Sequence, residues 1–152
     1  MTTPLIIKNQ IPIQALPSVV WKVLTQPEFI RQWDELPEDH DDQSFLETGS
    51  QILWRQPNGK VTKLTVTLAE INHLLKINLY NSYWPLRESE YNIAYLYTLE
   101  SLNQGTRLII EIGDFSTLPE GQNYFDASLE FAELASAKIK ILAESMPSGL
   151  DF

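Results

Sequence analysis

The chain contains no cysteine among its 152 residues. A disulfide framework, a thiolate nucleophile and a cysteine-ligated metal are therefore excluded. Basic residues are also few, since 11 lysines and arginines stand against 20 acidic residues and leave a net charge of -9. Because such a field repels phosphate backbones and anionic membrane surfaces, we expect neither nucleic-acid binding nor membrane insertion.

Long apolar runs are missing as well. The N-terminus offers only Leu5, Ile6 and Ile7 before Lys8, which is too short for the core of a signal peptide or for a membrane span. We therefore predict a cytoplasmic protein. The length suits one domain, placed over residues 1–152, and a hydrophobic fraction of 43% favours a packed core over disorder.

The sequence motifs of several enzyme classes are absent. There is no Gly-x-Ser-x-Gly, no P-loop and no dinucleotide-binding fingerprint. The two histidines are His40, in an acidic run, and His73, in a predicted hairpin turn; both positions suit solvated side chains better than a general base or a metal ligand. We predict no catalytic residue, no metal and no cofactor.

Two helix signals follow an apolar strand predicted over residues 4–14. Pro17 suits the first turn of a short helix that carries Trp21. Thr25 and Glu28 match a capping box, which predicts a second short helix ending at Trp33. The next residues, Asp34–Asp42, form the densest charge run; we interpret it as a solvated, mobile loop, with a divalent-cation site as the alternative.

Residues 44–114 are typical of strands joined by tight turns. Alternation places Leu64, Val66 and Leu68 on one face of a strand over 62–71, and it continues over 75–80, 93–102 and 107–112. Asn58-Gly59 predicts a hairpin with a type I′ turn, and Phe45–Glu47 is a short strand candidate before the turn at residues 48–50. The pattern predicts one antiparallel sheet of six or seven strands.

Helical spacing returns over residues 123–144 and predicts one long C-terminal helix. Its apolar arc is wider than a helix lying on a sheet needs, because Phe131, Leu134, Ile141 and Leu142 flank a first apolar face. Part of this helix is therefore expected to face a cavity, the short helices or another subunit.

The segment Ala15-x-Pro-x-x-Val-Trp-x-x-Leu-Thr-x-Pro-Glu-x-Ile-x-x-Trp33 resembles the N-terminal signature of the SRPBCC (START-like) superfamily. The branch it resembles is that of the homologues of the activator of heat-shock-protein ATPase. Gly105-Thr-Arg-Leu108 resembles the penultimate hairpin of that family, and the likeness spans nearly the whole chain. The resemblance implies a helix-grip α+β fold, in which the sheet wraps around the long helix and encloses an apolar cavity that in the superfamily binds lipids, hormones or polyketides.

The candidate cavity residues are those whose strand parity or position places them between the sheet and the long helix. They are Trp33, Trp54, Leu79, Tyr95, Tyr97, Ile112, Phe125 and Leu129. Ligand pockets are apolar with few polar groups, and an inward tyrosine needs a hydrogen-bond partner that a ligand can supply. The alternative is that these rings only fill the core.

Three functions remain open. The first is a binding protein for a small apolar or amphipathic molecule. The second is an interaction protein that docks on a chaperone or on a second copy of itself, which the wide apolar arc favours. The third is a cyclase- or hydratase-type enzyme, which needs an inward acid or base; Tyr97 is the one residue we name for that role.

Overall fold

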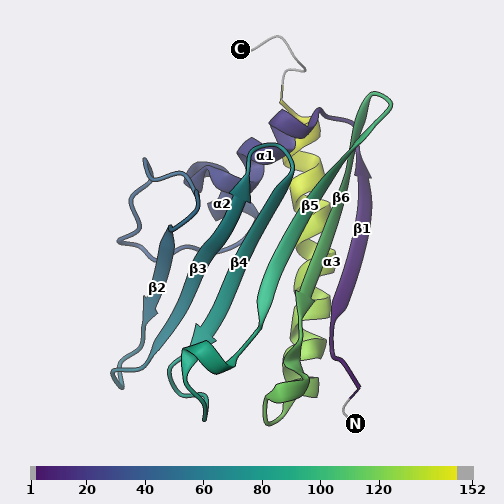
Figure 1. Cartoon of the computed structure of the whole chain (residues 1–152). Helices are drawn as coiled ribbons and strands as arrows, with labels where there is room; N and C mark the ends of the chain where they lie inside the picture. The colour runs from purple at the N-terminus through teal and green to yellow at the C-terminus, as the bar shows by residue number, and fades with distance from the viewer. Residues whose placement is uncertain (1–2, 147–152) are drawn as a thin grey trace.

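A computed structural model of the chain describes residues 3–146. Six strands form one sheet in the order β1-β6-β5-β4-β3-β2, and every neighbouring pair is antiparallel (Figure 1). The strands are β1 (Ile7–Ile13), β2 (Gln51–Arg55), β3 (Val61–Glu70), β4 (Leu74–Asn81), β5 (Ala94–Leu102) and β6 (Gly105–Gly113). The helices are α1 (Pro17–Thr25), α2 (Pro27–Trp33) and α3 (Gly121–Glu144), with short 3-10 turns η1 (Glu88–Glu90) and η2 (Phe115–Thr117). The predicted α+β helix-grip fold is confirmed.

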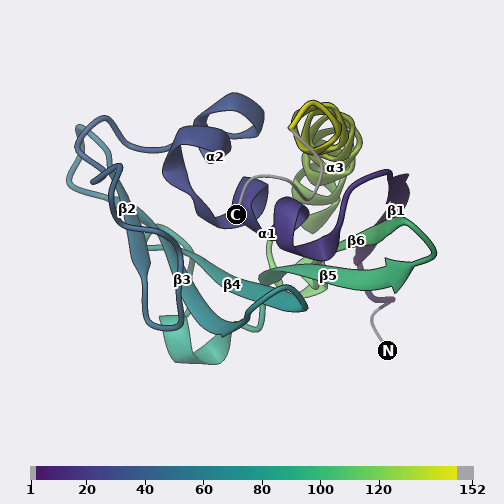
Figure 2. The same cartoon turned by 90° about the horizontal axis from the view of Figure 1, so that it is seen from above.

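The helices divide the inner face of the sheet between them. Figure 2 shows α3 above β1 and β6, and α2 above the part of the sheet formed by β3 and β4. None of the helices in residues 3–146 has the length and apolar character that a membrane crossing requires.

The core forms where α3 lies against the sheet. Leu108, Ile110 and Ile112 of β6 are fully buried, as the alternation predicts. On α3 the buried positions are mostly small, namely Ala132, Ala135, Ser136 and Ala143, with Ile139 as the large side chain among them. Small residues on this face let the helix approach the strands closely, which is how the core reaches high packing density.

One strand departs from simple alternation. A β-bulge lies between Val66 and Leu68 of β3, so Leu68 pairs with Lys76 and Ala69 pairs with Leu75. An extra residue in one strand turns every later side chain to the other face. Val66 is 1% exposed and Leu68 is 39% exposed, so the prediction that both lie on one face of the strand is wrong for Leu68.

Two predicted turn details also differ. The hairpin at Asn58-Gly59 is present between β2 and β3, but only Gly59 has a positive φ, of 83°, so the turn is not type I′. Gly59 donates its N–H to Gln56, the i to i+3 bond of a type I turn that ends at a left-handed residue. Phe45–Glu47 is not a strand; Leu46 donates its N–H to the carbonyl of Thr25 and is buried.

The expected capping box is wrong. The residue before α2 is Gln26, and no side chain caps the helix there. Thr25 instead ends α1 and donates its hydroxyl to the carbonyl of Trp21 at 2.8 Å. Proline stands at the first position of both helices, where its fixed φ suits the helix and the N–H that it lacks would have no partner within the helix.

Candidate ligand-binding site

A cavity of about 200 Å³ lies between α2, the segment that follows it, and the inner face of the sheet from β2 to β5. Its walls are mostly apolar, which is the usual composition of a ligand pocket. The lining residues are Leu24, Ile30, Trp33, Asp34, Glu35, Leu36, Leu46, Ile52, Trp54, Thr62, Leu64, Ile77, Leu79, Tyr95 and Tyr97.

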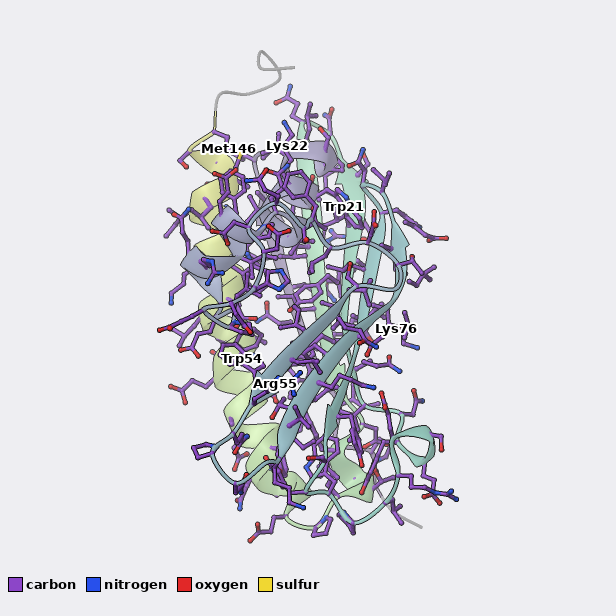
Figure 3. The ribbon with its side chains drawn as sticks, turned by 90° about the vertical axis from the view of Figure 1, so that its left-hand side faces the viewer. Trp21, Lys22, Trp54, Arg55, Lys76 and Met146 are labelled. Carbon is purple, nitrogen blue, oxygen red and sulfur yellow. The ribbon has the colours of Figure 1, made fainter. Side chains whose placement is uncertain are left out.

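Five of the eight candidate residues meet at this cavity: Trp33, Trp54, Leu79, Tyr95 and Tyr97. Figure 3 shows Trp54 on the side of the sheet that faces α3, whereas Lys76 lies on the opposite side. The structure does not bring the other three to it. Ile112 is fully buried in the core, Phe125 is partly buried, and Leu129 is 39% exposed.

The position of α3 explains these three differences. The helix lies over β1 and β6 (Figure 2), whereas the strand residues that line the cavity belong to β2, β3, β4 and β5. Its one ring that approaches the cavity wall is Phe131, whose centroid lies 5.9 Å from that of Tyr95 and 6.5 Å from that of Trp33. A helical wheel shows which face of a helix is apolar, but it does not show which strands that face covers.

Trp33 is held in the cavity wall from two sides. Its indole N–H donates to the carbonyl of Val23 in α1 at 2.8 Å. Its ring meets Tyr97 edge to face, with centroids 5.9 Å apart. Because the indole nitrogen is engaged within the protein, Trp33 offers a ligand only its apolar surface.

The two tyrosines supply polar atoms to the cavity. Within residues 3–146 neither the Tyr95 nor the Tyr97 hydroxyl has a protein hydrogen-bond partner, and neither oxygen is among the fully buried unpaired atoms, so both hydroxyls reach open space although Tyr97 as a whole is only 2% exposed. Burial, with the charge of Asp34 added, raises the pKa of Tyr95 to about 12 and that of Tyr97 well above its ordinary value. Both phenols therefore stay protonated and remain able to donate to a ligand.

Asp34 is a cavity-lining residue that the sequence pattern does not predict. It was placed in a solvated acidic run, yet it lines the cavity and is partly buried. Burial, reinforced by the charge of Glu35, raises the pKa of its carboxyl from 3.8 to about 6, against the lowering effects of the Glu35 backbone N–H and of Lys138. Its place directly after Trp33, the last residue of a core helix, was the signal available in the sequence.

The rest of the acidic run is organised by Arg31. Its guanidinium contacts Asp42 at 3.0 Å and donates to the backbone carbonyls of Leu36, Pro37 and His40 at 3.3–3.4 Å. Leu36 is buried beneath the loop. The run is exposed, as predicted, from Glu38 to Asp42 with the exception of His40, and in the described chain no group of three or more His, Asp or Glu side chains is placed to hold a metal ion.

Trp33, Asp34 and Glu35 also border a second hollow, which lies on the outer side of the cavity wall. The same three residues border a groove of about 450 Å³ on the surface between α2 and α3, whose other walls include Phe131, Leu134 and Lys138. They are therefore the partition between the cavity and this groove. A ligand in the cavity would meet the Asp34 carboxyl at this partition, near the Tyr95 and Tyr97 phenols.

Comparison with known proteins agrees with this fold. The crystal structure of protein MLL2253 from Mesorhizobium loti superposes with a TM-score of 0.72 at 19% identity, covering 93% of this chain and 98% of that one. The solution structure of the Aha1 dimer from Colwellia psychrerythraea gives 0.69 at 18% identity, covering 92% and 96%. DynU16, a putative protein in the dynemicin biosynthetic locus, gives 0.65 at 14% identity, covering 92% of this chain and 47% of that one. At these identities the likeness concerns the fold alone.

No curated protein matches the sequence. A family model does: the one described as Activator of Hsp90 ATPase homolog 1-like protein matches residues 14–144, which include both short helices, all strands but the first, and α3. The resemblance drawn from the Trp21 to Trp33 segment is thereby confirmed. The chain belongs to the family of Activator of Hsp90 ATPase homolog 1-like proteins.

Proposed function

We propose that this protein binds a small, largely apolar molecule in the cavity between α2 and the sheet. The observation that carries the proposal is a cavity with mostly apolar walls whose lining also includes Asp34, Glu35, Tyr95 and Tyr97, with Asp34 near enough for its charge to raise the pKa of both tyrosines. Such a combination of apolar walls and a few convergent polar groups is the usual signature of a ligand site. A bound ligand can supply the hydrogen-bond partner that both phenols lack within the described chain.

The volume limits the size of the ligand. About 200 Å³ lies below the range of roughly 300–1,000 Å³ that is common for drug-sized ligands, and an apolar cavity of about 150 Å³ in another protein holds benzene. A compact ring compound fits this space, whereas a long-chain lipid requires the cavity to open.

The test is an amide NMR titration with pools of compact aromatic alcohols, amines and acids. We expect shifts confined to residues around Trp33, Trp54 and Tyr97. Tyr97→Phe keeps the ring but removes a hydrogen bond, so binding should weaken by about 3- to 10-fold. Tyr83→Phe, which removes a hydroxyl from an exposed side chain outside the cavity, is the matched control. Silence of the wild-type protein across every pool would falsify the proposal.

Self-association is a second candidate function, supported by the exposed part of the apolar arc on α3. Phe131 packs on Trp33 and Tyr95, and Leu142 packs on the core, which accounts for half of that arc. Leu134 and Ile141 remain 55% and 68% exposed. The Aha1 protein from Colwellia psychrerythraea, which has a similar fold, is a dimer in its solution structure. Docking on a chaperone stays a prediction, because no feature of the described residues favours a chaperone over another partner.

Leu134→Asp tests this second function. If the exposed stripe joins two copies, light scattering should find a dimer for the wild-type protein and a monomer for the variant, because a buried unpaired carboxylate at an interface opposes association. Gln122→Glu is the control, since it adds a negative charge at an exposed position of the same helix about three turns before Leu134. A wild-type monomer at high protein concentration contradicts the proposal.

A further inference from the structure

The charge of the cavity lining is one-sided. Its ionisable groups that bear charge near neutral pH are two carboxyls, Asp34 and Glu35, and in the part of the chain that the structure describes no lysine, arginine or histidine lines it. Four aromatic side chains complete the walls: Trp33, Trp54, Tyr95 and Tyr97. This is a different environment from a cavity built for fatty acids, which needs a group to pair with a carboxylate.

The groups that surround Asp34 leave its charge available to the cavity. Glu35 adds a second negative charge at the rim, and the Tyr95 and Tyr97 phenols are neutral. Lys138 of α3 is the cation that acts on Asp34, but it is exposed and lines the groove on the outer side of the partition. Arg31 of α2 is engaged with Asp42 and with three loop carbonyls.

Elementary electrostatics decides which ligand charge this lining accepts. An ammonium group buried without an anion carries a large desolvation cost, which a neighbouring carboxylate and the negative faces of aromatic rings reduce. A ligand carboxylate would lie against Asp34 and Glu35 with no cation to pair it, so like charges would repel in a poorly solvated space.

From this arrangement we infer that the cavity selects a small organic cation, a protonated amine carried on a compact apolar body. The ammonium group donates to the Asp34 carboxylate, and the apolar body lies against Trp33, Trp54 and Tyr97. The inference rests on the proposed function, since it names the chemical class of ligand for the same cavity.

Binding of this kind depends on pH in a defined direction. Because the pKa of Asp34 is raised to about 6, the carboxylate that pairs the ammonium is fully present only above that pH. An aliphatic amine stays protonated throughout, so its affinity should be constant above about pH 7 and should fall below pH 6, by up to about tenfold per pH unit. A neutral ligand of the same shape should show no such loss.

The experiment compares three ligands of nearly equal shape by isothermal titration and NMR: phenethylamine, phenethyl alcohol and hydrocinnamate. For the wild-type protein at about pH 7.5 we expect the amine to bind at least about tenfold more tightly than the alcohol, because a hydrogen bond to a charged group is stronger than a neutral one, and the acid to bind least. Asp34→Asn should weaken amine binding by about 10- to 100-fold and leave alcohol binding within about threefold.

The matched control is Glu38→Gln. It changes the net charge by the same amount on an exposed part of the same loop, outside the cavity. Equal affinities for amine and alcohol overturn the choice of ligand class, and so does an equal loss of amine binding in Asp34→Asn and Glu38→Gln. Binding of the alcohol would in either case still demonstrate the pocket. Failure of all three ligands to bind the wild-type protein overturns the pocket itself.

Discussion

Trp33→Ala should lower the free energy of unfolding by about 3–5 kcal/mol, as removal of a large core ring usually does. The side chain is 5% exposed, and its ring contacts Tyr97 and Phe131. The loss of the ring also joins the cavity to the groove outside, because Trp33 borders both. Urea unfolding followed by far-UV circular dichroism measures the effect.

Part of this cost comes from the hydrogen bond of the indole rather than from the size of the ring. In an α-helix the carbonyl of residue 23 accepts the N–H of residue 27, but residue 27 is a proline and has no N–H. The Trp33 indole donates to that carbonyl at 2.8 Å and takes the place of the missing donor. Trp33→Phe, which keeps an aromatic ring, should therefore still cost about 1–3 kcal/mol through an unsatisfied buried carbonyl.

Trp54→Phe is the comparison that separates the two effects. Trp54 also lines the cavity, but its indole N–H makes no hydrogen bond within residues 3–146, and the side chain is partly exposed. We expect it to cost less than Trp33→Phe. If the two variants lose equal stability, the bond to Val23 contributes nothing and the account of the α1–α2 junction is wrong.

The fold could be predicted because its signals are local. The alternation in β4, β5 and β6 and the Asn58-Gly59 turn each determine structure through residues adjacent in the chain. The β3 bulge is not local in this sense, because it arises where the register with β4 shifts between Val66 and Leu68, and neither residue is unusual in sequence. Leu68 was accordingly placed on the wrong face.

The cavity residues on the strands could be predicted, because alternation along a strand determines which side chains face inward. Those on the long helix could not, because their place depends on how the helix is arranged on the sheet. Trp54, Leu79, Tyr95 and Tyr97 reach the cavity because each lies on the inward side of a regular strand. Phe125 and Leu129 do not, because the lateral position of α3 is set by packing across the whole core. Asp34 was not predicted, because a run of carboxylates indicates that the segment as a whole is exposed to solvent. It does not indicate the burial of a single residue that follows a buried tryptophan.

Asp34→Asn should raise the free energy of unfolding at about pH 7.5 by roughly 2–3 kcal/mol. The pKa of Asp34 is raised from 3.8 to about 6 in the folded protein, so folding favours the neutral carboxyl. The stabilising contribution of that neutral form is fully present below about pH 4 and is lost as the pH rises through 6. At neutral pH the folded protein therefore holds a charged group at a cost that the amide of asparagine removes.

Chemical denaturation at a series of pH values measures this gain, which should vanish as the pH falls to about 3, where wild-type Asp34 is mostly neutral in both states. Glu38→Gln, on an exposed part of the same loop, should show no gain that grows with pH. A variant Asp34→Asn less stable than the wild type at neutral pH contradicts the burial of a costly carboxyl.

The predicted gain in stability and the predicted loss of amine binding run in opposite directions in one variant. A carboxyl that weakens the fold at the wall of a cavity is expected where ligand binding offsets its cost, since core packing alone favours its removal.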